Sequence, residues 1–149
     1  MQDDERFELR RFLPYLLNHA AEAVSLEFQR TYKQRYGMLR TEWRVLFHLG
    51  QYGDMTARQI CDMARLHKTK VSRAVAALER KRFLTRQELA VDRRHSVMTL
   101  TRQGRQVFGD LTREARAFDA RIRAGMTREE IEILDRCLKR IARFDDAPV

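Results

Sequence analysis

The sequence has few of the residues that interrupt regular structure. Its 149 residues include two prolines, six glycines and two cysteines. So few prolines and glycines leave little room for long irregular segments, and a 44% hydrophobic content argues against a disordered chain. No run of about 18 apolar residues is present, which excludes a transmembrane helix. Residues 1–11 are rich in charge and lack an apolar signal core, so we expect a cytoplasmic protein.

The patterns of enzymes and metal sites are also missing. The sequence has no P-loop, Gly-rich phosphate loop or Ser-His-Asp arrangement, so no enzymatic activity is expected. The four histidines are scattered, and the cysteines lack metal-ligand spacing, so neither a metal nor a cofactor is expected. Cys61 and Cys137 fall inside helical patterns, which favours small buried apolar residues; a thiol sensor is the alternative.

Positive charge is concentrated in the middle of the chain. The formal net charge is +9, and residues 56–105 carry thirteen Lys or Arg but only four Asp or Glu. The remaining residues are balanced, with 17 basic and 17 acidic side chains. A basic block of this kind is the electrostatic signature of nucleic-acid binding. The length predicts a single domain, residues 1–149.

Hydrophobic periodicity predicts mostly helices with one short hairpin. A first helix opens near Pro14 and ends at Gly37, and a second is N-capped by Thr41 and ends at Gly50 and Gly53. The capping-box pairs Thr56/Gln59 and Thr127/Glu130 open two further helices. The others are a helix from about Lys68, strands over 84–89 and 96–101 joined by a tip over 90–95, and a long helix from Thr101 to Gly125.

Two short helices joined at residues 65–67 predict a helix-turn-helix whose second helix enters the major groove of DNA. Apolar residues line one face of that helix, and the other face carries residues suited to bases and phosphates: Lys68, Thr69, Lys70, Ser72 and Arg73. The hairpin tip adds Arg93 and Arg94, which we expect to reach a narrow minor groove. A solvated charged face is the alternative for the helix alone, and the adjacent hairpin disfavours it.

These motifs resemble the MarR family of bacterial transcriptional regulators. The resemblance runs from about Tyr15 to Phe144 and is most specific at Asp92-Arg93-Arg94 and at the Leu-Thr-x-x-Gly run of residues 100–104. It implies a mostly α (α+β) fold with a winged helix-turn-helix lobe over 41–104. It also implies a homodimer joined by helices over 8–37 and 105–145, a base-reading helix that carries Ser72 and Arg73, and an Asp92 that braces the wing. The family usually has Gly at the position of Arg82.

The resemblance extends to a small-molecule effector. Members of the family bind small anionic aromatics between the helical and DNA-binding lobes, and the run over 42–46 resembles relatives tied to aromatic-acid catabolism, some of which answer to coenzyme A thioesters. The residues here that match such a pocket are Tyr15, His19, Trp43, Arg44, Phe47 and His48. Trp43 and Phe47 would serve equally well as ordinary core. Peroxide sensors of the family carry a Cys in the first helix, which this chain lacks.

The sequence therefore predicts a dimeric DNA-binding transcriptional regulator, most often a repressor in this family, on a palindromic operator. Two alternatives stay open. One is a basic architectural or RNA-binding protein that uses the same face without sequence specificity. The other is a helical adaptor protein with an idle wing. The apolar stripes of the terminal helices are explained by pairing between two copies or by packing within a monomer.

Overall fold

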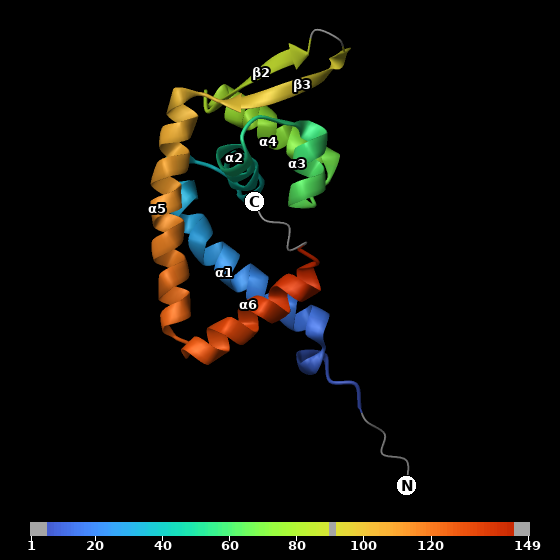
Figure 1. Ribbon diagram of the computed structural model, residues 1–149, viewed down its shortest axis with the longest axis vertical. Coiled ribbons are helices and arrows are strands. Elements are labelled where there is room, and N and C mark those ends of the chain that lie inside the picture. The colour runs from blue at the N-terminus through green and yellow to red at the C-terminus, as the bar shows by residue number, and fades with distance from the viewer. Residues whose placement is uncertain (1–5, 90–91, 145–149) are drawn as a thin grey trace. The chain divides into compact units, whose positions relative to one another are not determined.

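Six α-helices and three strands make up the regular structure of the computed structural model, which describes residues 6–89 and 92–144. Contacts divide the chain into two units, Met1–Leu111 and Thr112–Val149. The elements are a 3-10 turn at Leu9–Arg11, α1 (Leu13–Tyr36), α2 (Arg40–Tyr52), β1 (Met55–Thr56), α3 (Ala57–Ala64), α4 (Lys68–Arg80), β2 (Leu84–Leu89), β3 (Asp92–Leu100), α5 (Arg102–Ala124) and α6 (Arg128–Ala142) (Figure 1).

The predicted helix signals are confirmed at most ends. Pro14 lies in the first turn of α1, and Gly37 ends that helix with a φ of 61°, a left-handed conformation that glycine adopts without strain. In α3 the Thr56 hydroxyl accepts from Gln59 N at 3.2 Å, and Gln59 Oε1 accepts from Thr56 N at 2.9 Å. The same reciprocal pair opens α6. Local sequence thus sets these boundaries.

Two predicted boundaries of α2 are wrong. Thr41 is not the N-cap, because the helix begins at Arg40, after Leu39. Glu42 satisfies this end instead, since its Oε2 accepts from Leu39 N at 2.7 Å. Gly50 does not end the helix either; α2 continues to Tyr52 and ends at Gly53. The ring of Phe108 packs against α2 at Gly50. A Cβ at this position would overlap that ring.

The strands form one antiparallel sheet in the order β1-β3-β2. The strand over 84–89 is confirmed, but β3 begins at Asp92 rather than Ser96, so residues 92–95 belong to the strand and not to a tip. Ala90 and Val91 lie outside the described residues. The two-residue β1, which the sequence analysis missed, pairs Met55 with Met98 and Thr56 with Val97. It fastens the start of α3 to the hairpin.

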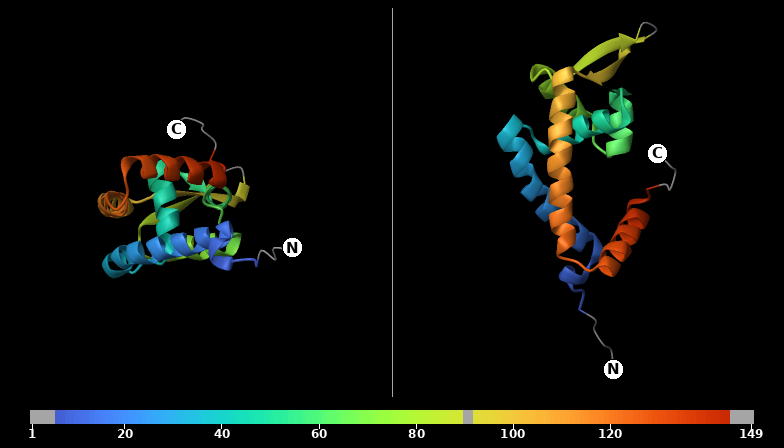
Figure 2. Two further views of the ribbon diagram at one scale, coloured as in Figure 1. Left: turned by 90° about the horizontal axis from the view of Figure 1, so that it is seen from below. Right: turned by 60° about the vertical axis from the view of Figure 1, so that its left-hand side comes forward.

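The buried core lies in the first unit. Its largest fully buried side chains come from α1 to α4, the α1–α2 connection, the hairpin and α5, and include Tyr32, Met38, Leu46, Ile60, Leu78, Leu84, Met98 and Leu111. The chain gives each helix an apolar stripe, and packing the stripes together removes them from water, at about 25 cal/mol per Å². Figures 1 and 2 show the β2–β3 hairpin beside the α3–α4 pair.

A cluster of backbone contacts explains the Leu-Thr-x-x-Gly run. The Thr101 hydroxyl donates to the Arg82 carbonyl at 2.7 Å, and the same oxygen accepts from Gly104 N at 3.0 Å, which caps α5. Thr101 N also donates to the Phe83 carbonyl at 3.0 Å. A Cβ on Gly104 would lie 1.9 Å from that carbonyl oxygen, so only glycine lets α5 start this close to the α4–β2 turn.

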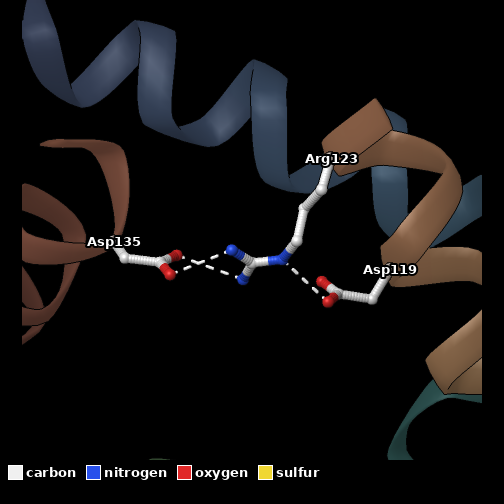
Figure 3. A network of polar contacts seen from close by, with 3 residues as sticks. All are labelled: Asp119, Arg123 and Asp135. Atoms are coloured by element: carbon white, nitrogen blue, oxygen red, sulfur yellow. Dashed lines mark hydrogen bonds and ion pairs between the residues drawn. The ribbon is translucent and has the colours of Figure 1, made fainter. Parts of the chain in front are cut away.

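The second unit holds the rest of α5 and α6. Arg123 joins them: its guanidinium contacts Asp135 of α6 at 2.9 and 3.1 Å and Asp119 of α5 at 2.7 Å (Figure 3). These contacts raise the pKa of Arg123 and lower the pKa of Asp135. Over residues 112–144 no side chain is buried. Several apolar residues of α6, among them Leu134, Leu138 and Ile141, are exposed.

The burial of the two cysteines differs from the expectation. Cys61 and Cys137 are both half-exposed, so the expectation of buried cysteines is wrong. Within the described ranges no helix is long and apolar enough to cross a membrane.

Candidate nucleic-acid interface

Helix α4 separates its apolar and polar residues onto opposite faces. Val71, Ala74, Val75, Ala77 and Leu78 are buried against the rest of the first unit. The five residues of this helix that were predicted to contact DNA are all exposed: Lys68, Thr69, Lys70, Ser72 and Arg73. The structure thus brings them together on one surface.

That surface has a single sign of charge. Lys68, Lys70 and Arg73 contribute three cations, and the first carboxylate along α4 is Glu79. Glu79 is paired with Arg86 of β2 at 3.2 Å, so it lies at the hairpin side. An α-helix fits into the major groove, where its cations can contact phosphates. A guanidinium can also donate to the O6 and N7 atoms of guanine.

The entry to α4 is fixed by a strained turn. Arg65 ends α3 in a left-handed conformation, with a φ of 51°. His67 then caps α4, since its Nδ1 accepts from Thr69 N at 3.2 Å. From α2, the Arg44 guanidinium donates to the Ala64 carbonyl at the end of α3. This capping role of His67 was not predicted, although His67 directly precedes the predicted start of the helix at Lys68.

The turn after α4 shows how the chain accommodates Arg82 where the family usually has glycine. Arg82 adopts a φ of 64°, so it takes the left-handed conformation that the family's glycine would take. Phe83 N donates to the Leu78 carbonyl and Arg82 N to the Glu79 carbonyl, both at 2.9 Å, which closes the helix end. Nearby, Lys81 Nζ lies 3.4 Å from the carboxylate of Glu42, which is 5% exposed. This pair ties α2 to the end of α4.

The wing residues are placed by their backbone alone. Asp92, Arg93 and Arg94 belong to β3, and Asp92 pairs with Leu89 beyond an irregularity of the ladder between Glu88 and Leu89. Their side chains lie outside the described residues. The expectations that Arg93 and Arg94 contact DNA and that Asp92 braces the wing therefore stay predictions.

The six residues predicted to line an effector pocket lie in three places. Trp43 and Phe47 join an aromatic cluster: Trp43 stacks on Tyr32 with ring centroids 5.6 Å apart, and Phe47 meets Phe108 edge-on at 5.1 Å. Tyr15 and His19 contact each other at 4.1 Å near the start of α1. That pair lies nine residues or more before Phe28, the α1 residue that contacts Trp43, which is about 13 Å along a helix.

Arg44 contacts the end of α3, and His48 contacts other residues of α2. Desolvation by burial lowers the pKa of Arg44, and the nearby Arg40 charge lowers it further. His48 Nδ1 lies 2.6 Å from the Arg44 carbonyl. Two polar features at the cluster were missed by sequence reasoning. Trp43 Nε1 is buried without a hydrogen-bond partner within the described ranges, and Arg40 forms an ion pair with Glu22 at 3.1 Å.

No group of three or more potential metal ligands occurs over residues 6–89 and 92–144. What the described part of the chain does present is a helix-turn-helix, α3 and α4, followed by an antiparallel hairpin and backed by α2. This arrangement, with an exposed cationic second helix, is that of the winged helix-turn-helix DNA-binding proteins.

Comparison with known proteins narrows the class. A sequence profile of the MarR family matches residues 36–95. An uncharacterized HTH-type transcriptional regulator of Bacillus subtilis, YwaE, is 25% identical over 126 residues, which cover 85% of this chain and 74% of that protein. A MarR/EmrR family regulator from Acinetobacter sp. ADP1 is 25% identical, with a TM-score of 0.81 over 92% of this chain and 96% of that chain.

The profile and both relatives make this chain similar to the MarR family of transcriptional regulators. The fold is shared more widely than the sequence. The structure of the S. aureus MepR–DNA complex matches with a TM-score of 0.79 at 19% identity, over 89% of this chain and 96% of that chain. The predicted fold class, mostly helical with a winged helix-turn-helix lobe, is confirmed.

Proposed function

We propose that this regulator binds a palindromic operator as a homodimer, with α4 of each subunit in the major groove. The observation that carries the proposal is the exposed face of α4, where three cations and two hydroxyls gather with no carboxylate before Glu79. Thr69 and Arg73 would contact base edges, and Lys68, Lys70 and Ser72 would contact phosphates. The MepR–DNA complex, which has the same fold, supports DNA as the partner.

The test separates base reading from phosphate contact. Arg73→Ala should weaken binding to the operator by about 1–3 kcal/mol and relax preference at one base pair of each half-site. Lys70→Ala should weaken all duplexes equally and reduce the slope of log K against log salt. Arg116→Ala, an exposed arginine of α5, is the matched control and should change neither. If Arg73→Ala leaves selectivity intact, α4 does not read bases through this residue.

The proposed role of the wing is to read groove width. Arg93 and Arg94 would enter the minor groove beside the α4 site, and Asp92 would brace the hairpin end. A·T-rich flanks narrow the minor groove and strengthen its negative potential, so they should bind more tightly. Arg94→Ala should abolish that flank preference, measured by titration of one palindrome with A·T-rich or G·C-rich flanks. An unchanged preference would show that Arg94 does not read the width of the minor groove.

The homodimer is supported by apolar residues left uncovered at both ends of the chain. Near the N-terminus Phe7, Leu13 and Leu16 are exposed, and near the other end so are Leu138 and Ile141 of α6 and the 67% exposed Phe144 after it. Such surfaces usually mark partner sites. We expect sedimentation at twice 17.8 kDa at micromolar concentration. Removal of residues 1–36 should cause aggregation, and a stable soluble monomer from that truncation would contradict the dimer.

A small aromatic acid or its coenzyme A thioester is the proposed effector, and it would release a repressor from DNA in the cytoplasm. Support comes from the buried Trp43 Nε1, a hydrogen-bond donor that lacks a described partner, beside the cationic Arg40. The structure of Bordetella bronchiseptica BpsR, 19% identical with a TM-score of 0.82, concerns regulation of its DNA binding by 6-hydroxynicotinic acid. It covers 93% of this chain and 99% of BpsR.

The single tryptophan makes the effector proposal directly measurable. Aromatic acids added to the protein should quench or shift Trp43 fluorescence and weaken DNA binding over the same concentration range. Tyr15, His19, Phe47 and His48 are the remaining candidates, and Arg44 is already bonded to the end of α3. A panel of aromatic acids that changes neither signal would argue against an effector of this class.

A further inference from the structure

A groove lined by cationic and hydroxyl side chains runs along one side of α4. It lies where α3, α4 and β3 meet, and its volume is about 410 Å³. The described residues that line it are Thr56, Ala57, Arg58, Cys61, Lys68, Ser72 and Ser96.

The lining comes from four elements: β1, α3, α4 and β3. Lys68 and Ser72 are one helical turn apart on α4, so they share a face. Arg58 and Cys61, three residues apart, likewise share a face of α3. Ser96 precedes Val97, which pairs with Thr56 across the β1–β3 ladder, and this pairing brings the strand to the start of α3. The groove is therefore built by the sheet and the helix-turn-helix together.

The chemistry of the lining favours an anion along its length. Arg58 and Lys68 are exposed cations, and Thr56, Ser72 and Ser96 supply hydroxyl donors, with no carboxylate among the described lining residues. The Thr56 hydroxyl oxygen accepts from Gln59 N, which leaves its own proton to donate. The groove on the opposite side of α4, by contrast, includes the carboxylate of Glu42.

The position of the groove beside α4 indicates which anion it would bind. A major groove is about 12 Å wide, and a helix with its side chains is about 10–12 Å across, so a helix in that groove has a phosphate strand close on each side. If α4 is the base-reading helix, one of those strands passes over the α3 side. This step rests on the proposed function.

We propose that this groove receives the phosphodiester backbone of one DNA strand, with Arg58 and Lys68 on the phosphate charges and Ser72 and Ser96 donating to phosphate oxygens. A backbone in this position covers the Cys61 thiol. DNA binding and modification of Cys61 then exclude each other, although Cys61 itself contributes no binding energy.

The first experiment measures the salt dependence of DNA binding for Arg58→Ala. With one phosphate charge lost per subunit, the slope of log K against log salt should fall by about 2 per dimer, at about 0.9 per phosphate. The loss should be equal for operator and random duplex, and Arg58→Lys should restore most of the slope. Arg116→Ala serves again as the control. An unchanged slope in Arg58→Ala would overturn the role of Arg58.

The second experiment uses the thiol as a reporter. In a Cys137→Ser variant, N-ethylmaleimide adds to Cys61: a sulfur–carbon bond forms across the maleimide double bond, and the thiol proton ends on the adjacent carbon. At a duplex concentration ten times Kd, the reaction rate should fall about tenfold. In Cys61→Ser, duplex should not change the rate at Cys137. Ala57→Cys in a chain without other cysteines provides a second thiol on the same wall.

The outcomes separate the two proposals. Binding of duplex without protection of either thiol would overturn the groove assignment and leave the DNA-binding function standing. Absence of any duplex binding at low salt would overturn the proposed function, and the groove assignment with it. Prior alkylation of Cys61 should weaken binding to random duplex and operator alike, and alkylated protein with unchanged affinity would also contradict the groove assignment.

Discussion

Arg82→Gly should stabilise the protein, although the substitution removes a charged side chain. Arg82 holds a φ of 64°, and a residue with a Cβ in the left-handed region costs about 1–2 kcal/mol. Glycine removes that cost but increases the entropy of the unfolded chain, which offsets about 0.5–1 kcal/mol. The backbone contacts of this turn, from Thr101 to the Arg82 carbonyl, do not depend on the side chain. We therefore expect a net gain of about 0.5–1 kcal/mol.

Urea denaturation at fixed protein concentration measures the gain. With a slope of about 2 kcal/mol per molar urea, the midpoint should rise by about 0.3–0.5 M while the slope stays constant. Arg82→Ala is the matched control: it removes the same charge but keeps a Cβ, so its midpoint should stay near that of the wild type. Equal gains from Ala and Gly would show that charge repulsion, not backbone strain, limits stability here, and would refute the reasoning.

Two further predictions concern backbone approach and charge. Gly104→Ala should destabilise the first unit by about 1–3 kcal/mol in the same urea assay, because its Cβ would lie 1.9 Å from the Phe83 carbonyl oxygen; a smaller loss than 0.5 kcal/mol would contradict that geometry. The Asp135 carboxyl should titrate below its ordinary range by NMR, and Arg123→Gln should restore it. This pair's contribution to stability is fully present above about pH 4 and is lost as pH falls through the depressed pKa.

The local signals in the sequence predicted much of the fold because they act over a few residues. Thr56 with Gln59, and Thr127 with Glu130, set helix starts through contacts three residues apart. The inward face of α4 followed from apolar spacing alone. These features need no knowledge of the rest of the chain, which is why pattern reasoning found them.

The features that were missed depend on contacts between distant residues. Gly50 reads as a helix end, but it remains helical where the ring of Phe108 packs against it. The strand β1 has two residues and exists through its pairing with β3. The same limit applies to the site. Sequence spacing placed Arg73 on the outer face of α4, but only the β1–β3 ladder brings Ser96 into a groove with Arg58.

The central claim is that α4 reads DNA sequence, and selection from a random duplex library tests it most directly. Wild-type protein should enrich one palindrome with half-site centres about one helical turn apart, and bind it at least about 10³-fold more tightly than random duplex at the same salt. Arg73→Ala should lose selectivity at one position of each half-site. A library that stays random after selection, with equal affinity for all duplexes, would contradict the account and favour a basic protein that binds nucleic acid without regard to sequence.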